Sequence, residues 1–522
     1  MKSLPVGIQS FEKLISGNYL YIDKTKYIYD LITSNNACFL SRPRRFGKSL
    51  LISTLEALFL GKKELFSGLW IEQSNYEWVK HPVIKIDFSR LPSRSPASLQ
   101  VGLGKEFTEI ADFYGLSCNA RDEIESQTLD LIAGLYDKTG QKIAVLIDEY
   151  DSPIISNLNH PEVVESNQEI LAGFYRTIKS SDRYLRFVFL TGVSRFSKVS
   201  VFSGLNNLRD ISLTDEFADL LGYTQLELEN HFGEAVDSIS TEFKIDREAL
   251  LADIKRWYNG YRFSARDALV YNPFSTLLFF SEKKFRNYWF ETGTPTFLFD
   301  LIRKNNYDIR RMQRSALTDR AFNSYDVDKI PLLPVLYDTG YLTIAEVREK
   351  RIRQFDYILD YPNDEVRISF LEQFVDDAFN LKVEANNYVR MLTDCLHLDN
   401  LDQFIETIKT FFAEIPYDIQ SPNRNTEAYY QSLIYCLLKL VGYDTYAEER
   451  TNKGRIDLVV EGTSSIYIFE MKVDASAQEA IAQIKKRGYA EKYRLADKKL
   501  LMVGLSFSSA ERNLTQFEVE AI

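Results

Sequence analysis

The chain has 522 residues and a net charge of −11, with 45% hydrophobic residues. This length predicts two to four domains at roughly 100–200 residues each. The negative charge argues against a surface that binds nucleic acid over its whole extent, although it allows a local basic groove. The four cysteines lack the paired spacing of a zinc motif or a disulfide framework, so we expect a reducing, cytoplasmic location. No apolar run approaches ~18 residues, so no membrane span is expected.

The N-terminal half contains a basic, glycine-containing segment between an apolar run and a helical pattern. Residues 41–51 read Ser-Arg-Pro-Arg-Arg-Phe-Gly-Lys-Ser-Leu-Leu, after the apolar residues 37–40 and before a helical pattern that continues to residue 59. Strand, loop and helix form the context of a phosphate-binding loop, because loop N–H groups and the helix N-terminus then point at the phosphates. The residues expected to bind nucleotide here are Arg44, Arg45, Phe46, Gly47, Lys48, Ser49 and Leu50.

Lys48 and Ser49 are the chemically decisive residues of this segment. Lys48 would reach the β/γ-phosphates of ATP, and the Ser49 hydroxyl would ligate Mg²⁺. Arg42 stands where the general G-x-x-x-x-G-K-[ST] pattern has its first glycine. Glycine alone adopts positive φ freely, so the start of this loop must differ from the common one. The additional arginines could reach phosphate themselves, and the competing interpretation is a basic surface turn before a helix.

Two further apolar runs end in polar residues suited to nucleotide chemistry. The first ends at Asp148 and Glu149, which would hold Mg²⁺ and polarise the attacking water, respectively. The second, within residues 185–195, carries Thr191 near its tip as a candidate γ-phosphate sensor and Arg195 as a candidate charge stabiliser. Ordinary strand ends are the competing interpretation for both.

The alternation of strand and helix patterns predicts a doubly wound parallel α/β sheet with its ligand at the strand carboxyl ends. The preceding segment, residues 11–32, would either pack over the nucleotide base or serve as a plain structural lead-in. From residue 206 onward helical patterns dominate, at 214–232, 238–258 and 272–280. A helix over 326–336 followed by a hairpin then predicts a winged-helix-like lid. The expected domains are residues 1–205, 206–415 and 416–522, with the last boundary in the Pro- and Asn-containing stretch 416–426.

The C-terminal pattern places two carboxylates and a lysine on adjoining strands. Asp457 lies within the strand pattern 454–460, and Glu470 and Lys472 lie within 465–473. Strand side chains alternate, so Glu470 and Lys472 emerge on one face. If Asp457 ends the neighbouring antiparallel strand, the two carboxylates can share Mg²⁺ or Mn²⁺, and Lys472 can orient a water for attack on phosphorus. A solvated strand face is the competing interpretation.

Neighbouring helices could complete this C-terminal constellation. Glu427 could add a carboxylate, and Gln483 and Tyr489 could lie beside the site. Residues 451–500 contain ten Lys or Arg and seven Asp or Glu, a balance of +3 in a chain of −11. Ordinary helix roles and a solvated helix face are the alternatives. The residues of this stretch that could approach a phosphate backbone are Lys485, Lys486 and Arg487.

Four ordered motifs resemble a known bacterial family, the AAA-ATPase-like proteins. They are Tyr21-Ile22-Asp23-Lys24-Thr25, Arg42-Pro43-Arg44-Arg45-Phe46-Gly47-Lys48-Ser49, Asp148-Glu149-Tyr150-Asp151 and Gly192-Val193-Ser194-Arg195-Phe196-Ser197. That family often carries a C-terminal PD-(D/E)XK nuclease domain, which Asp457, Glu470 and Lys472 resemble. The resemblance implies an AAA-type P-loop ATPase, a helical winged-helix-like region and a restriction-endonuclease-like α/β domain. Arg42 in place of glycine is similar to the family's own pattern.

We therefore expect a cytoplasmic protein that binds, and slowly hydrolyses, ATP and thereby controls a Mg²⁺- or Mn²⁺-dependent nuclease. Its expected partners are ATP and nucleic acid, either DNA or RNA, and no membrane; assembly into a homo-oligomer is left open. The alternative is a nucleotide-dependent regulatory or scaffold protein whose nuclease-like domain binds nucleic acid or a partner without cleavage. The two hypotheses differ in whether the protein cleaves DNA or RNA with a divalent ion.

Overall fold

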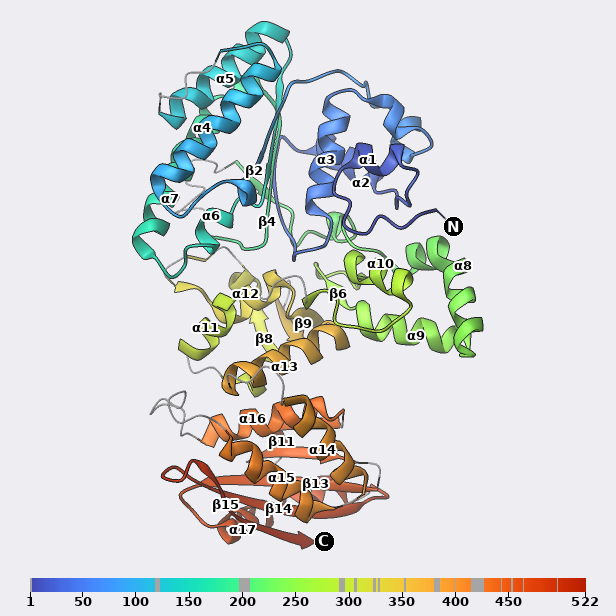
Figure 1. Ribbon diagram of the computed structural model, residues 1–522, viewed down its shortest axis with the longest axis vertical. Helices are drawn as coiled ribbons and strands as arrows, with labels where there is room; N and C mark the ends of the chain where they lie inside the picture. Colours follow the sequence, from blue (N-terminus) through green and yellow to red (C-terminus); the bar gives the residue numbers. More distant parts are fainter. Residues whose placement is uncertain are drawn as a thin grey trace. The chain divides into compact units, whose positions relative to one another are not determined.

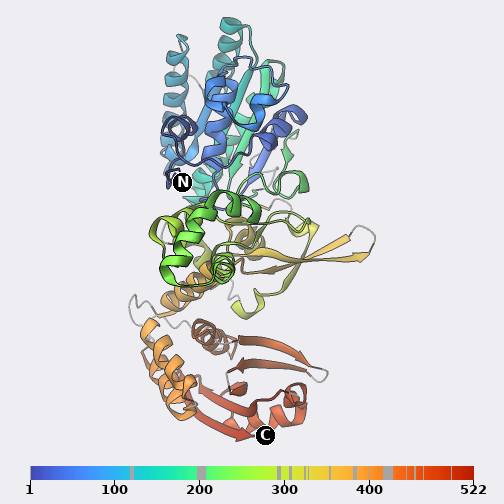
Figure 2. The ribbon, with the colours of Figure 1, turned by 90° about the vertical axis from the view of Figure 1, so that its right-hand side faces the viewer.

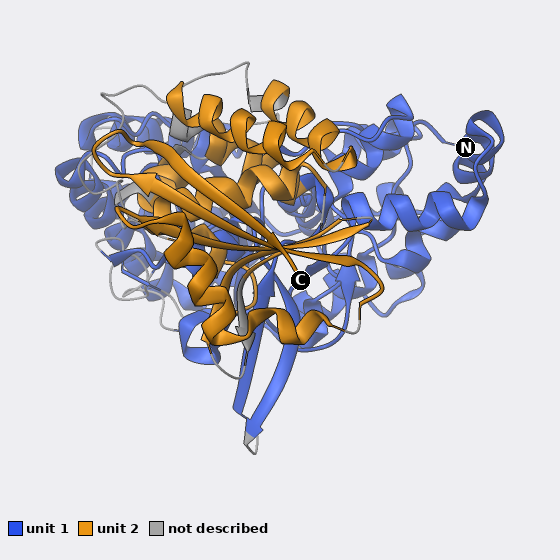
Figure 3. Ribbon diagram, turned by 90° about the horizontal axis from the view of Figure 1, so that it is seen from below, with its two compact units in different colours: residues 1–292, 316–365 blue, residues 293–315, 366–522 orange. Residues whose placement is uncertain are grey.

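A computed structural model of the chain divides into two compact units (Figures 1 and 3). Unit 1 comprises residues 1–292 and 316–365, and unit 2 comprises residues 293–315 and 366–522. The structure describes residues 2–522 except 118–122, 197–206, 291–295, 305–307, 323–324, 327–328, 352–353, 380–384, 399, 415–426, 443, 452–453, 463 and 495. The predicted boundary at 416–426 therefore lies outside the described residues, and the three-domain division stays a prediction.

Unit 1 is built on a five-stranded parallel sheet in the order β2-β3-β4-β1-β5. Every residue of β1 and β3 is buried, as the continuous apolar runs predict for strands covered on both faces. The predicted parallel α/β sheet is confirmed. Its strands are β1 (Ala37–Ser41), β2 (Val83–Asp87), β3 (Ile143–Asp148), β4 (Leu185–Gly192) and β5 (Arg209–Asp210).

Helices cover both faces of this sheet (Figure 1). On one face lie α4 (Pro96–Phe113), α5 (Ile124–Thr139) and α7 (Pro161–Ser180). On the other lie α1 (Phe11–Ser16), α2 (Thr25–Ser34) and α3 (Lys48–Phe59). Helix α4 begins with a capping box at Ser95 and proline at its first turn, both of which favour a helix start. The carboxyl ends of β1, β3 and β4 thus meet beside the N-terminus of α3.

A helical and hairpin region completes unit 1. Helices α8 (Gln225–Phe243), α9 (Arg247–Tyr258) and α10 (Pro273–Glu282) enclose an apolar cluster that also holds Ile22. The prediction of a helix over 214–232 is wrong at its start, because a capping box between Thr224 and Glu227 begins α8 at residue 225. Helix α12 (Leu332–Thr339) precedes a sheet of β8 (Ser315–Thr318), β9 (Thr343–Arg351) and β10 (Gln354–Asp360), whose β9–β10 hairpin forms a long ribbon (Figure 2).

Unit 2 contains a mixed five-stranded sheet in the order β11-β12-β13-β14-β15. Strands β13 and β14 are parallel and their other neighbours are antiparallel. The predicted C-terminal α/β sheet is confirmed, and sequence reasoning missed β15. The strands are β11 (Asp444–Thr451), β12 (Gly454–Glu461), β13 (Ser465–Val473), β14 (Lys499–Ser508) and β15 (Asn513–Ala521), and the helices of this unit include α11 (Thr296–Lys304), α13 (Asp364–Phe379), α14 (Ala385–His397), α15 (Leu401–Ala413), α16 (Glu427–Leu440) and α17 (Ala477–Arg487).

The two faces of this sheet are packed by different helices. Helix α17 contributes Ile481 and Ile484 to an apolar cluster with Val459 and Ile468. On the opposite face, Tyr430 of α16 stacks on Phe507 with ring centroids 4.4 Å apart. Among the described residues, no helix combines the length and apolar character needed to cross a membrane.

Close packing of α17 on β14 predicts a strong effect of a single methyl group. A β-carbon at Gly504 would lie 2.5 Å from the Ala477 carbonyl oxygen, so we expect Gly504→Ala to lower the free energy of unfolding by about 1–3 kcal/mol. Gly233, inside α8, is the matched control: apart from its chain neighbours and the backbone of its own helix, no described atom lies within 4 Å of its added β-carbon. Gly233→Ala should stabilise by up to about 1 kcal/mol. Denaturant titration followed by circular dichroism measures both, and equal effects would contradict the packing argument.

Candidate functional site

The loop between β1 and α3 folds around the Lys48 ammonium group. Gly47 has φ of 95°, a left-handed conformation that glycine adopts without strain, and it caps α3. Lys48 is 4% exposed, and its Nζ donates to the carbonyl oxygens of Arg42 at 3.0 Å and Pro43 at 3.2 Å. The same Nζ lies 3.3 Å from Oε1 of Glu149. The loop thus places the predicted phosphate-binding lysine next to the carboxylate predicted to polarise water.

A cavity of about 380 Å³ opens over this loop. Its charged and polar lining includes Arg44, Arg45, Lys48, Ser49 and Glu149. Its apolar lining includes Pro5 and Ile8 from the first residues of the chain, Leu14 of α1, Tyr223, and Phe274 and Leu277 of α10. Gly47 and Leu50 also line it. A polyanionic head and a planar apolar group are the two parts of a ligand that such a lining suits.

The position of residues 11–32 relative to a nucleotide base stays a prediction. Of residues 11–32, Leu14 lines the cavity, whereas the motif at 21–25 acts elsewhere: Lys24 Nζ bonds Glu227 of α8 at 2.6 Å, and Asp23 accepts from the Trp70 N–H at 2.6 Å. Sequence reasoning missed Pro5, Ile8 and Phe274. Apolar residues far apart in the chain carry no motif that would have identified them.

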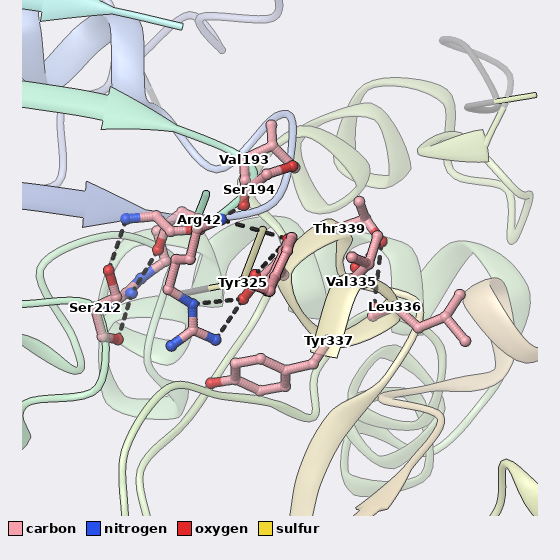
Figure 4. A network of polar contacts seen from close by, with 12 residues as sticks. Arg42, Val193, Ser194, Ser212, Tyr325, Val335, Leu336, Tyr337 and Thr339 are labelled. Carbon is pink, nitrogen blue, oxygen red and sulfur yellow. Dashed lines mark hydrogen bonds and ion pairs between the residues drawn. The ribbon is translucent and has the colours of Figure 1, made fainter. Parts of the chain in front are cut away.

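Arg42 and Phe46 anchor the loop from its buried side. The Arg42 guanidinium donates to the carbonyl oxygen of Ser212 at 2.7 Å (Figure 4). It also donates to the carbonyl oxygen of Phe217 at 3.2 Å and lies 4.1 Å from the Phe263 ring centroid. Burial lowers the pKa of Arg42 to about 10. Phe46 is 1% exposed and packs edge-on against Tyr261 at 4.8 Å. Arg44 and Arg45, in contrast, are exposed at the cavity.

Ser49, Asp148 and Thr191 meet where β3 and β4 end. Ser49 and Asp148 line a second hollow of about 310 Å³ together with Asp87. Asp87 and Asp148 are register partners in the neighbouring parallel strands β2 and β3. Oxygen donors of this kind are the ligands that Mg²⁺ prefers, so the residues fit the ion. Thr191 is fully buried, and its hydroxyl donates to Oδ1 of Asp148. Thr191 is therefore placed to orient Asp148 from behind.

Arg195 lies apart from the cavity, in a buried ion pair. Its Nε donates to Oδ1 of Asp338 at 2.8 Å, and Tyr325 donates to the other Asp338 oxygen at 3.2 Å (Figure 4). Asp338 belongs to α12. Arg195, three residues after the end of β4, is thus bonded to α12. The structure does not place Arg195 beside Lys48 and Glu149. The sequence contains no signal for this pairing, because the partners are 143 residues apart.

Asp151 fixes the backbone after β4. Its Oδ2 accepts hydrogen bonds from the backbone N–H groups of Val193 at 3.1 Å and Ser194 at 2.6 Å. Asp151 also lines the cavity. Its Oδ1 has no hydrogen-bond partner within the described part of the chain. Burial, with repulsion from Glu149, raises the pKa of Asp151 to about 7. Sequence reasoning assigned no role to this residue.

In unit 2, Asp457, Glu470 and Lys472 come together as predicted. Pairing of β12 with β13 ends at Leu458 opposite Phe469, and Oδ2 of Asp457 accepts the Met471 N–H at 2.9 Å. Oε1 of Glu470 accepts from Lys472 Nζ at 3.0 Å and from the Gln483 amide of α17. The sequence analysis considered Asp457 as the end of its strand. In the structure Asp457 lies inside β12, next to Leu458, where the pairing of β12 with β13 stops.

This second site is short of positive charge. Burial raises the pKa of Glu470 to about 8, and repulsion from Asp457 adds to the increase. Burial likewise raises the pKa of Asp457 to about 6, with Glu427 adding to it. Glu470 Oε2 is buried, and none of the described groups hydrogen-bonds to it. A divalent cation between the two carboxylates would supply the missing positive charge and would give Glu470 Oε2 a partner. The residues therefore fit Mg²⁺ or Mn²⁺. Over the described ranges, no group of three or more His, Cys, Asp or Glu side chains has metal-site geometry.

Comparison with known proteins covers both sites. A family model described as "Predicted AAA-ATPase" matches residues 5–202. A second model, described as "PD-(D/E)XK nuclease superfamily", matches residues 425–517. A protein of Azotobacter chroococcum mcd 1, named "Uncharacterized protein in vnfD 5'region", is 37% identical over 528 residues, which cover 100% of this chain and 99% of that protein. The similarity therefore extends over the whole chain.

The hydrogen bond from Thr191 to Asp148 predicts an effect on metal affinity. Thr191→Val keeps the shape of the side chain but removes the hydroxyl, so Asp148 loses its orienting donor. We expect Mn²⁺ to bind the protein–ATP complex about tenfold more weakly in Thr191→Val, and Thr191→Ser to restore the affinity. Calorimetry measures both, with metal-free ATP binding as the control. Equal Mn²⁺ affinity of the valine and wild-type proteins would refute the orienting role.

The raised pKa of Asp151 predicts a pH-dependent stability. Its ordinary value is 3.8, so between about pH 4 and 7 the folded protein keeps a proton that the unfolded chain releases. Stability of the wild type should fall as the pH rises through this window. Asp151→Asn removes the titration, so the unfolding free energy of the variant relative to the wild type should rise by about 4 kcal/mol from pH 4 to pH 8. Thermal melts across this range measure it, and a constant difference would contradict the assignment.

Proposed function

Because this chain belongs to the AAA-ATPase-like family and carries a domain of the PD-(D/E)XK nuclease superfamily, we propose that ATP binding controls a divalent-metal-dependent cleavage of nucleic acid. The nucleotide would bind in unit 1 and the phosphodiester would be cleaved in unit 2. The proposed division is an ATPase domain at 1–205, a helical lid at 206–415 and a nuclease-like domain at 416–522.

The nucleotide part of the proposal rests on the residues gathered around Lys48. Lys48 would bind the β- and γ-phosphates, and Ser49 and Asp148 would hold Mg²⁺. Glu149 would accept a proton from, and orient, the attacking water. The contact of 3.3 Å between Lys48 and Glu149 supports this assignment, because a phosphate entering beside Lys48 would lie next to Glu149. The exposed Arg44 and Arg45 would add charge at the phosphates.

The observation that carries the nuclease part is the Oε2 atom of Glu470, which is buried, has no hydrogen-bond partner among the described residues and belongs to a carboxylate that Asp457 repels. Asp457 and Glu470 would hold the metal ion, which when bound supplies Lewis-acid stabilisation of the phosphate and a more acidic water. Lys472 would orient that water from its position on the same strand face. Gln483 would keep the Glu470 carboxylate in place through its amide.

Variants of the three C-terminal residues test the proposal. Asp457→Ala and Glu470→Ala should lose both Mn²⁺ binding and cleavage, because they remove the anchors of the ion. Lys472→Ala should keep the ion and lose cleavage by about 100-fold or more, because its role is on the water. The measurements are Mn²⁺ calorimetry and cleavage of single- and double-stranded DNA and RNA, each with and without ATP.

Lys48→Ala and Glu149→Gln extend this experiment to the control by ATP. Lys48→Ala should abolish ATP binding, and Glu149→Gln should bind ATP without hydrolysing it. Cleavage that is equal with and without ATP, in protein that binds ATP, would remove the control. Intact DNA and RNA under every condition would leave the alternative, a nucleotide-dependent module that binds nucleic acid or a partner without cutting.

A further inference from the structure

Helix α17 presents one side to the candidate metal site and continues into three exposed cations. Its inner residues Ala480, Ile481 and Ile484 are buried, and Gln483 donates to Glu470. The last turn carries Lys485, Lys486 and Arg487, all of which are exposed. On a helix, residues three and four positions apart lie on the same side. Lys486 and Arg487 therefore follow Gln483 on the side of the metal site, and Lys485 does not.

Contacts at the start of β12 place Arg487 independently of helical periodicity. A β-carbon at Gly454 would lie 3.7 Å from Cδ of Arg487 and 3.0 Å from the Tyr489 hydroxyl. Gly454 is three residues before Asp457 on the same strand. The stem of Arg487 thus lies against the start of β12, three residues along the strand from Asp457.

Tyr489 supplies a second link between Arg487 and the site. Burial raises the pKa of its phenol, Glu470 adds to the increase, and Arg487 opposes it. Glu470 and Arg487 are therefore both within electrostatic reach of one hydroxyl. Arg455 completes the arrangement, because it is exposed and lies two residues before Asp457, on the same face of β12.

These cations resolve an electrostatic conflict. Asp457, Glu470 and Glu427 form an acidic centre, and such a centre repels a polyanion. Cations beside the centre would offset that repulsion and fix the path of the polyanion past the carboxylates. Guanidinium groups suit this role, since their planar forks bind phosphate oxygens in pairs.

We propose that Arg455, Lys486 and Arg487 form a rim that binds the phosphodiester backbone of nucleic acid beside Asp457 and Glu470. This inference rests on the proposed function of that site and names the residues that hold its substrate. Lys485 lies outside the rim, where it pairs with Glu520 of β15.

Charge-neutral variants with a matched control test the rim. Arg455→Gln, Lys486→Gln and Arg487→Gln each remove one positive charge, and Lys485→Gln removes the same charge from the same helix turn. Fluorescence anisotropy measures binding of a DNA duplex of about 20 base pairs, and of a single-stranded RNA of similar length, over a range of salt concentrations. Ca²⁺ replaces Mg²⁺ so that the probes stay intact. Mn²⁺ calorimetry checks that each variant keeps the acidic centre folded.

Each rim variant should weaken duplex binding about 3- to 10-fold at low salt and reduce the slope of log K against log salt by about 0.9. Lys485→Gln should change affinity less than twofold. Equal effects of Lys485→Gln and Arg487→Gln would overturn the rim, because net charge alone would then explain binding. Failure of the wild type to bind either probe would also overturn it. The DNA and RNA arms show which nucleic acid the rim prefers.

The same measurements separate the rim from the nuclease proposal. Binding that depends on Arg487, in a protein that cleaves nothing with Mn²⁺, would support the rim and refute cleavage. Cleavage with unchanged salt slopes in all three rim variants would support the nuclease and refute the rim.

Discussion

The guanidinium group of Arg42 lies inside the protein and is held by the backbone carbonyl oxygens of Ser41, Ser212 and Phe217. A buried cation is costly unless polar groups surround it, so this contact requires residues 212–217 to sit against the loop. The Lys48 ammonium group adds a second requirement, because it draws the carbonyl oxygens of Arg42 and Pro43 inward. Together the contacts of these two cations fix the backbone of the loop at its first residue, Arg42, and at Lys48, where α3 begins. The geometry of the cavity follows from that, since Arg44, Arg45 and Ser49 stand on the backbone that these contacts fix.

The two candidate sites satisfy their buried charges in opposite ways. In unit 1 the chain provides its own cation, and Glu149 stands beside Lys48. In unit 2 two carboxylates face each other, and Lys472 contacts one oxygen of Glu470 while the other oxygen is buried without a described partner. The first site is therefore suited to receive an anion at a preformed positive centre. The second is suited to receive a cation between preformed acids.

Sequence patterns predicted those parts of the structure that local chemistry determines. Continuous apolar runs identified β1 and β3, and the Gly47-Lys48 pair identified the start of α3. Alternation along β13 placed Glu470 and Lys472 on one face. Other features depend on residues far apart in the chain. The partner of Arg195 is Asp338, and the apolar lining of the cavity combines Ile8 with Phe274; neither pairing leaves a periodic pattern. Thr191 was correctly placed at the strand tip, yet its hydroxyl contacts Asp148, which only the packing of β3 against β4 reveals.

The ion pair between Arg195 and Asp338 also constrains how this chain can evolve. Both side chains are almost fully buried, at 3% and 1% exposure. Losing one partner leaves the other as an uncompensated charge, at a cost of about 3–5 kcal/mol, whereas replacing both by apolar residues of similar volume can be nearly neutral. An evolutionary path from the ion pair to an apolar pair therefore passes through a single mutant that is less stable than either. Drift at position 195 is conditional on position 338, although the two codons are far apart in the gene, and related chains should retain or lose the two residues together.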